Sequence, residues 1–263
     1  MTESKTDAVL REPGRRRFLP LPLLLTAVVL TMTVSAIIMS VAAVLTLFQA
    51  RRFYAETIGR ATGRTLLWLC QVRLIVHRDG LCTDAYSPRR QVVYISNHTS
   101  TLDVFALIAL GLPNTRFFLS GFLRKFIPLG VIGYLVGNIW TVPYKFPEQR
   151  RKIFQAADRL LRRTGESVYL SPEGARITTG EIGKFNKGAF HLATSLQAQI
   201  VPMYIAIDKS ANPGAGWDVH PGEIHVYFRE PIDTAGWRVE DLDANRQAVR
   251  EVFLAWHEEL RTR

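Results

Sequence analysis

The segment "QVVYISNHTSTLDVFALIALGL", residues 91–112, carries two different apolar patterns on either side of a polar turn. Residues 91–96 are a short run rich in valine, isoleucine and tyrosine, which is typical of a buried strand. Residues 102–112 are mostly leucine, alanine and valine over a length that suits a helix. The segment therefore predicts a strand that leads through a polar turn into a helix.

The chain beyond residue 87 repeats this alternation of short apolar runs and helical patterns. Further strands are predicted at 167–171, 199–207 and 223–228, and helices at 148–163 and 240–261. Pro202 lies in the second of these strands and predicts an edge strand or a bulge, because proline has no backbone N–H to donate. The pattern indicates an α/β fold, with a mixed central sheet flanked by helices.

The N-terminal region contains a long apolar run. No charged residue lies between Arg17 and Arg51, and a membrane-crossing helix needs about 20 apolar residues. Residues 19–50 are therefore predicted to be a transmembrane or membrane-embedded helix, preceded by a basic tail at 1–18. A cleaved signal peptide is the competing interpretation, although its apolar region usually has about 7–15 residues. Basic residues flank the run on both sides, so its orientation is left open.

Residues 51–86 are predicted to be a linker with an amphipathic helix. Within this region, residues 65–76 are apolar but too few to span a membrane, and they include Arg73. This stretch either lies at a membrane interface or packs against the domain as a buried core helix.

The balance of charges suits an anionic partner. The chain has 33 Lys and Arg residues against 23 Asp and Glu residues, a net charge of +10, which attracts nucleic acid, anionic lipid or a phosphorylated substrate. A nucleic-acid partner is not expected, because the arginines at 150–163 lack the interleaved aromatic residues of such surfaces. The two cysteines, Cys70 and Cys82, form no C-x-x-C pair, which disfavours a zinc site or a disulfide framework.

His98 and Asp103 lie five positions apart at the polar turn. Five residues of a regular helix turn through about 500°, which would point the two side chains about 140° apart. They can meet only if His98 precedes the helix and Asp103 lies in its first turn. Asn97, Thr99 and Ser100 are all suitable caps for that start, and Ser100 with Asp103 resembles a capping box. The pair is therefore either part of a helix cap or a catalytic pair.

A histidine–aspartate pair suits general base chemistry. A neutral imidazole accepts a proton near neutral pH, and a carboxylate on its other nitrogen fixes the tautomer and stabilises the imidazolium that forms. The chain contains no G-x-S-x-G elbow, no H-E-x-x-H motif and no glycine-rich phosphate loop of known pattern. His98 is thus expected to activate a hydroxyl group of the substrate.

A second polar segment, "SPEGAR" at 171–176, follows a predicted strand. Open α/β sheets bind their ligands at such strand ends. Gly174 lets the backbone approach a ligand closely, and Arg176 offers a fork of donors that suits phosphate. Lys184 and Lys187 add positive charge nearby in the sequence. An ordinary solvated turn is the alternative interpretation.

Four blocks of the sequence together resemble the glycerolipid acyltransferases, the family that includes 1-acylglycerol-3-phosphate acyltransferase. The block "NHTSTLD" (97–103) resembles the family's N-H-x-x-x-x-D motif, and "SPEGAR" resembles its F-P-E-G-T-R block. The block "KFNKGAFHLA" (184–193) is similar to the K-x-x-G-A-F segment that follows, and "IVPMYI" (200–205) to the later V-P-V block. The likeness covers about residues 90–207 in the family's order, and four blocks in order are a specific signal.

The resemblance implies that residues 87–263 form an acyltransferase domain, which moves a fatty acyl group from a coenzyme A or acyl-carrier-protein thioester to a lipid hydroxyl. His98 would be the general base, and Asp103 would orient it. Arg176 would hold the phosphate of the acceptor, while Glu173 would shape that loop or bind a hydroxyl.

Other residues have weaker expected roles. Further candidates for substrate binding are Gly174, Lys145, Lys184 and Lys187. His191, His225 and His257 are expected to pack in the protein or face solvent. No metal and no cofactor are expected, because the thioester co-substrate is already activated.

The implied acceptor is a lysophospholipid, in the first place 1-acylglycerol-3-phosphate, which would give phosphatidic acid. Acceptor and product carry long acyl chains and stay in a bilayer, so membrane lipids are expected partners. The domain is expected at the cell membrane and facing the cytoplasm, where the thioester donor is found.

Two departures from the family pattern leave the acceptor open. Pro143 stands at about the place where the family usually has an arginine, with Lys145 two residues further on. Ser171 and Ala175 replace the phenylalanine and threonine of the third block. Another lysophospholipid, an aminolipid or a glycolipid is therefore an alternative acceptor. A non-catalytic membrane-binding protein is the lesser alternative.

Overall fold

The computed structural model describes residues 19–78, 90–208, 211–212, 214, 216 and 218–262. The basic tail predicted at 1–18, Cys82 and the predicted start of the domain at 87 lie outside these residues.

The described residues form a seven-stranded sheet whose strand order is β1-β7-β6-β2-β5-β3-β4. The strands are β1 (Val72–His77), β2 (Val93–Ser96), β3 (Thr115–Ser120), β4 (Ile139–Thr141), β5 (Ser167–Leu170), β6 (Ile200–Ile207) and β7 (Gly222–Phe228). All neighbouring strands are parallel except β6 and β7. The central strands β2 and β5 are buried at every position, as expected for a parallel sheet that is covered on both faces.

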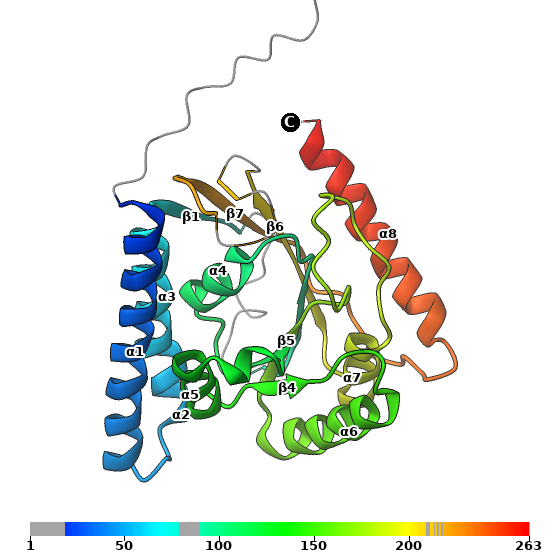
Figure 1. The fold of residues 1–263 in the computed structure, drawn as a ribbon. Coiled ribbons are helices and arrows are strands. Elements are labelled where there is room, and N and C mark those ends of the chain that lie inside the picture. The colour runs from blue at the N-terminus through cyan, green and yellow to red at the C-terminus, as the bar shows by residue number, and fades with distance from the viewer. Residues whose placement is uncertain are drawn as a thin grey trace, which may run out of the picture.

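Helices cover both faces of the sheet (Figure 1). They are α1 (Leu21–Leu45), α2 (Arg51–Phe53), the π-helix η1 (Tyr54–Gly59), α3 (Arg60–Leu69), α4 (Leu102–Leu110), the 3-10 turn η3 (Leu123–Lys125), α5 (Ile127–Leu135), α6 (Pro147–Thr164), α7 (Gly188–Leu196) and α8 (Leu242–Arg261). One apolar core joins α1, α3, α4 and α5 to one face, and a second core joins α6, α7 and α8 to the other. The predicted α/β fold with a mixed, helix-flanked sheet is confirmed.

Most of the predicted elements are present, and two expectations are corrected. Residues 72–76, assigned to the linker with its amphipathic helix, belong instead to β1, which pairs in parallel with β7. The edge strand or bulge predicted from Pro202 is wrong, because β6 lies inside the sheet between β7 and β2. The Pro202 carbonyl accepts the Arg229 amide, and pairing with β7 starts only at Met203. Proline lacks a backbone N–H, and Pro202 lies just before the first residue of β6 that pairs with β7. The antiparallel pairing therefore loses no hydrogen bond at this position.

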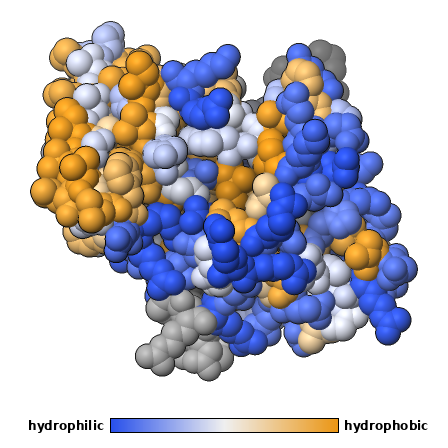
Figure 2. Space-filling model, turned by 90° about the horizontal axis from the view of Figure 1, so that it is seen from below, coloured by the Kyte–Doolittle hydropathy of each residue, from blue (hydrophilic) through white to orange (hydrophobic). Residues whose placement is uncertain are grey.

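Helix α1 is the one helix within the described residues that is long and apolar enough to cross a membrane. It packs lengthwise against the domain through Leu24, Val28, Met32, Met39 and Ala43. Its opposite side exposes a second set of large apolar residues, namely Leu30, Val34, Ile37, Ile38, Val41, Val44 and Leu45. Figure 2 shows hydrophobic residues gathered on the side of the molecule where α1 lies, while much of the remaining face is hydrophilic. Exposed apolar surface of this extent marks a membrane or partner contact.

A buried ion triad ties the N-terminal helices to the sheet. The Glu166 carboxylate binds both Arg51 of α2 and Arg116 of β3, and Arg51 also donates to the Val136 carbonyl at 2.9 Å. Burial opposes ionisation of Glu166, but the two guanidinium groups outweigh burial and hold the pKa of this carboxyl below its usual value. The triad therefore fixes the position of α2 relative to β3 and the end of α5.

Candidate active site

His98 and Asp103 meet where β2 leads into α4. The Nδ1 atom of His98 lies 2.7 Å from Oδ2 of Asp103, and Asp103 is the second residue of α4. His98 thus precedes the helix and Asp103 lies in its first turn, which is the arrangement that the five-residue spacing requires. The Asp103 side chain is 1% exposed and the His98 side chain 28% exposed. The pair is therefore buried on the aspartate side and accessible on the histidine side.

The same aspartate also organises the turn. Its Oδ2 atom accepts the backbone amides of Thr99 at 2.8 Å and Ser100 at 3.0 Å, while Ser100 Oγ accepts the amide of Leu102 at 3.0 Å. Helix capping and contact with His98 were alternative interpretations of the sequence, and the structure shows both. Because Oδ2 accepts two amide donors, Asp103 is held as an acceptor, and Nδ1 of His98 is the donor to it.

Asn97 has a different role from the cap that was considered for it. Its side-chain amide donates to the Ile205 carbonyl at 2.9 Å and accepts the Ile205 amide at 2.8 Å. These two bonds lock the end of β2 to β6, so the residue before His98 cannot shift. The family motif begins with asparagine, but the partner in β6 lies 108 positions away and is not readable from spacing.

Glu173 braces the histidine turn from the loop after β5. Its Oε2 accepts the His98 amide at 2.7 Å, and its Oε1 accepts the Gly183 amide at 2.7 Å. Burial raises the pKa of this carboxyl, although the amides of Gly183 and His98 oppose that effect. The Ile177 amide also donates to the His98 carbonyl at 2.8 Å. Both Glu173 oxygens are thus engaged by backbone, which supports the loop-shaping role rather than contact with a substrate hydroxyl.

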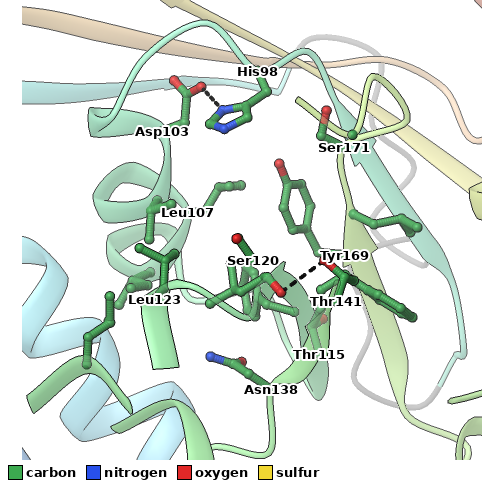
Figure 3. Close-up of a pocket in the computed structure, with 18 of the residues that line it drawn as sticks. His98, Asp103, Leu107, Thr115, Ser120, Leu123, Asn138, Thr141, Tyr169 and Ser171 are labelled. Carbon is green, nitrogen blue, oxygen red and sulfur yellow. Dashed lines mark hydrogen bonds and ion pairs between the residues drawn. The ribbon is translucent and has the colours of Figure 1, made fainter. Parts of the chain in front are cut away.

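A pocket of about 430 Å³ extends from this pair into the core (Figure 3). His98 and Asp103 stand at one end and Asn138 at the other, with Leu107 and Leu123 on one wall and Tyr169 on the opposite wall. Further apolar lining comes from α4 and α5 through Val104, Ile108, Leu129 and Ile132. The pocket thus has a polar end at His98 and Asp103, followed by a largely apolar interior.

Two arginines line the same pocket near its polar end. Arg176 is exposed and donates to the Thr101 hydroxyl. Arg150 of α6 stacks on the Tyr144 ring, 4.1 Å from its centroid, and donates to the Val142 carbonyl at 2.9 Å. Gly174 also lines the pocket, and a Cβ at this position, where φ is +66°, would lie 1.8 Å from the Tyr144 hydroxyl. Only glycine therefore fits between the loop and the tyrosine.

The three candidate lysines are not part of the pocket lining. Lys145 is exposed with Nζ 5.1 Å from the Phe146 ring centroid, and Lys184 is exposed. Lys187 pairs with Asp243 of α8 at 2.6 Å. The cation that lines the pocket together with Pro143 is thus Arg150 rather than Lys145. Sequence reasoning missed Arg150 because the helix predicted at 148–163 contains several arginines, and its pattern does not show which of them lines a pocket.

The remaining predicted histidines lie outside this pocket. His191 is exposed, and His225 binds His77 at 2.9 Å and Glu223 at 3.1 Å. His257 is buried, with Nδ1 2.6 Å from the Tyr204 hydroxyl. They pack or face solvent as expected. Among the described residues, no group of three or more His, Cys, Asp or Glu side chains is placed to hold a metal ion.

Three buried polar atoms of residues that line the pocket lack hydrogen-bond partners in the described structure. They are Asp103 Oδ1, Ser171 Oγ and Asn138 Oδ1. Ser171 stands at the level of His98, whereas Asn138 lies at the far end (Figure 3). Unpaired buried polar atoms are costly, so both are placed for contact with something that enters the pocket.

The chain is similar to known acyltransferases in sequence. Residues 81–206 match the family model described as Acyltransferase. The 1-acyl-sn-glycerol-3-phosphate acyltransferase of Limnanthes alba is 26% identical over 203 residues, which cover 74% of this chain and 67% of that protein. The human 1-acyl-sn-glycerol-3-phosphate acyltransferase beta is 29% identical over 193 residues, covering 70% and 69% of the two chains.

A solved structure shares the fold. The crystal structure of the 1-acyl-sn-glycerophosphate acyltransferase from Thermotoga maritima superposes with a TM-score of 0.72 over 93% of this chain and 99% of that chain. The sequence identity is 18%, so this likeness concerns the fold alone.

Proposed function

This chain belongs to the glycerolipid acyltransferase family, and on that premise we propose that it acylates the free hydroxyl of 1-acylglycerol-3-phosphate to give phosphatidic acid. The acyl donor is a coenzyme A or acyl-carrier-protein thioester. The observation that carries the proposal is the 2.7 Å contact between His98 and Asp103 at the polar end of an apolar pocket lined by Arg176.

The reaction uses His98 as general base. Because the Nδ1–H group of His98 donates a hydrogen bond to Asp103, the Nε2 atom carries the free lone pair of the ring. This lone pair takes the proton of the acceptor hydroxyl. The hydroxyl oxygen attacks the thioester carbonyl carbon, and the tetrahedral intermediate then releases the thiolate. His98 returns the proton to the sulfur, so the products are an ester and a thiol. Asp103 stabilises the imidazolium between these two steps.

The pocket divides the substrates by polarity. Its apolar interior, formed mainly by α4, β3 and α5, accommodates an acyl chain and excludes water from the reacting carbonyl. Arg176 and Arg150 hold the acceptor's phosphate near the polar end, because guanidinium groups bind phosphate oxygens in pairs. Lys145, Lys184 and Lys187 lie outside the pocket lining and would contact only a headgroup that extends beyond it.

The exposed side of α1 attaches the protein to the membrane that contains its substrate. A predominantly apolar helix of 25 residues is long enough to cross the hydrocarbon core, and a helix that packs lengthwise on its domain can also lie within one leaflet. In either case the domain stays at the cell membrane on the cytoplasmic side, where the thioester donor is available. The net charge of +10 favours anionic lipid.

A different acceptor is the second candidate. Pro143 and Ser171 line the pocket at positions where the family pattern has arginine and phenylalanine, and both differences are close to where an acceptor headgroup would bind. An acceptor with less negative charge or with an additional hydrogen-bonding group, such as an aminolipid or a glycolipid, fits these two changes.

A panel of lysolipids with a radiolabelled acyl thioester tests both candidates. The full chain in mixed micelles is offered lysophosphatidate, other lysophospholipids, an aminolipid and a glycolipid, each with acyl-CoA and with acyl carrier protein. We expect fastest turnover with lysophosphatidate and a loss of about 10²–10⁴-fold in His98→Ala. The matched control is His191→Ala, an exposed histidine outside the pocket. Fastest turnover with a phosphate-free acceptor would exclude the first candidate, and unchanged turnover in His98→Ala would exclude the assigned base.

A further inference from the structure

A second groove, of about 540 Å³, lies between α3 and β1. Its wall includes Ala109 and Leu110 of α4, whereas the acyl pocket is lined by Val104, Leu107 and Ile108 on another face of that helix. Helix α4 therefore separates the groove from the pocket, and nothing in the proposed reaction uses the groove.

Helix α3 presents a basic and aromatic stripe to this groove. Arg60, Arg64 and Trp68 are spaced four residues apart, which places them on one face of the helix. Neither the Arg60 nor the Arg64 side chain forms a hydrogen bond or an ion pair with any described residue, and Arg60 Nε is buried without a partner. Trp68 is 70% exposed. Two guanidinium groups beside an exposed indole are thus left unused by the fold.

The position of Arg60 is fixed by packing rather than by charge. Its side chain lies against Gly111, where a Cβ would be 2.7 Å from Arg60 Cδ, and φ at this glycine is +64°. The glycine that ends α4 thus makes room for the arginine stem. A guanidinium that is held in place without a counter-ion is prepared to bind an anion.

The composition of the groove indicates what kind of anion fits. None of the residues that line it is acidic, and its base is apolar. The apolar lining comes from Leu67, Val72, Leu74, Val76, Ala109 and Leu110. A small inorganic anion needs no apolar base, whereas a phospholipid has a phosphate and acyl chains next to each other.

The groove also lies beside the membrane-attaching helix. Helix α3 packs against α1, and the Thr62 hydroxyl donates to the Ser35 hydroxyl at 2.8 Å across their interface. Tryptophan and arginine are the side chains enriched at the level of lipid headgroups. The stripe on α3 is thus one helix away from the exposed apolar side of α1.

We propose that this groove binds one phospholipid with an anionic headgroup. Arg60 and Arg64 bind its phosphate, Trp68 lies at the level of its glycerol, and the apolar base contacts the start of its chains. The site is separate from the acceptor site at Arg176 and holds the enzyme on anionic regions of the bilayer. The lipid source of the phosphate rests on the proposed membrane attachment through α1.

The test uses the full chain in uncharged detergent micelles and follows quenching of tryptophan fluorescence by brominated lipids. Brominated phosphatidylglycerol and brominated phosphatidylcholine are added in separate titrations, and the quenching by the two lipids is compared. We expect saturable quenching that is stronger with brominated phosphatidylglycerol than with brominated phosphatidylcholine. The saturable part should disappear in Trp68→Phe. In Arg60→Gln/Arg64→Gln, the lipid concentration that gives half-maximal quenching should rise about tenfold. Arg64→Gln alone, which leaves the packing on Gly111 intact, should shift it in the same direction by a smaller factor.

The matched control is Arg159→Gln/Arg163→Gln, which removes two exposed arginines with the same spacing on α6. This control removes the same amount of positive charge from a surface away from the groove. It should leave the lipid concentration for half-maximal quenching within about twofold of the wild-type value. Equal quenching by both lipids, or equal effects of the two double variants, overturns the proposal. Displacement of the lipid by an equal concentration of inorganic phosphate would also overturn it, in favour of a free-phosphate site. Flotation with vesicles of phosphatidylcholine alone reports separately on attachment through α1.

Discussion

The two ends of the pocket that begins at His98 are built in different ways. At the His98 end, the polar groups of the turn support one another: Asp103 binds His98, Thr99 and Ser100, and Glu173 binds the His98 amide. At the other end, Asn138 Oδ1 is buried with no partner in the described structure. The ring and backbone of His98 are thus overdetermined by short contacts, although Asp103 Oδ1 and Ser171 Oγ at this end also lack partners in the described structure. The far end leaves an amide oxygen unsatisfied in apolar surroundings.

We expect this difference to separate the chemical step at the His98 end from the selection of the substrate chain at the Asn138 end. A histidine held by several mutually dependent bonds keeps one geometry, so the chemistry at that end is fixed. An unpaired amide at the end of an apolar pocket gains a partner only from a ligand or a water, so that end responds to the chain that reaches it. Variants at each end should therefore affect different kinetic parameters.

The largest expected effect is that of Asp103→Asn at the overdetermined end. The amide keeps the shape of the carboxylate but removes its charge and presents donors toward the amides of Thr99 and Ser100. The wrong histidine tautomer and the loss of imidazolium stabilisation should lower kcat by about 10²–10⁴-fold. Single-turnover acyl transfer measures the change, with thermal unfolding to confirm the fold. A loss below about tenfold would mean that the aspartate acts only as a helix cap.

Glu166→Gln tests the ion triad of Glu166 with Arg51 and Arg116, which lies near the Asn138 end of the pocket. It removes the partner of Arg51 and Arg116, two partly buried cations, and should lower the free energy of unfolding by about 3 kcal/mol. Because the folded-state pKa of Glu166 is depressed, the wild-type contribution is present above the unfolded-state value near 4.5 and is lost as the pH falls through the folded-state value.

Denaturant unfolding of both proteins between pH 3 and pH 7 checks this expectation. The stability difference between wild type and Glu166→Gln should be largest near neutral pH and should shrink in acid. A difference that does not depend on pH would assign the cost to packing rather than to the ion triad. The exposed pair of Arg151 with Glu148 provides the control, since Glu148→Gln should cost less than about 1 kcal/mol at any pH.

The His98 end was largely predictable from the sequence, and the Asn138 end was not. His98 and Asp103 lie within one short turn, so their spacing and the helix start restrict their geometry. The pocket interior combines α4, β3, η3, α5, β4 and β5, whose relative positions depend on tertiary packing. Arg150 reaches the pocket from α6, and only the fold shows that it stacks on Tyr144, which precedes this helix.

Strand β1 shows the same limit. Residues 65–76 read as one apolar stretch, but the backbone leaves the helix at Cys70, and residues 72–77 find a partner in β7, about 150 positions later. Periodicity over so few residues does not separate the end of a helix from an edge strand. The predicted limits of the N-terminal tail, the linker and the acyltransferase domain remain predictions.

Ser171→Ala addresses the third block, where serine replaces the phenylalanine of the family pattern. The Ser171 hydroxyl has no partner in the described structure and lines the pocket at the level of His98. If it donates a hydrogen bond to the acceptor or the thioester, its removal should lower kcat/KM by about 3–10-fold while leaving stability unchanged or slightly higher. A loss that is the same for every acceptor in the panel would indicate contact with the thioester. A loss confined to one acceptor would assign the hydroxyl to the headgroup.

The narrowest expected effect, confined to long acyl chains, is at the far end, where Asn138→Leu replaces the unpaired amide oxygen by an apolar side chain. Chains long enough to reach this position should then bind better, because they no longer cover an unsatisfied oxygen, whereas shorter chains should be unaffected. We expect the ratio of kcat/KM for the longest to the shortest acyl thioester to rise by about 3–10-fold, with kcat for short chains unchanged. The control is Asn245→Leu, which removes another buried unpaired amide nitrogen, on α8 and outside the pocket. If both variants change chain preference alike, or if neither does, the amide of Asn138 does not set the length of chain that the pocket accepts, and the unsatisfied oxygen is met by water.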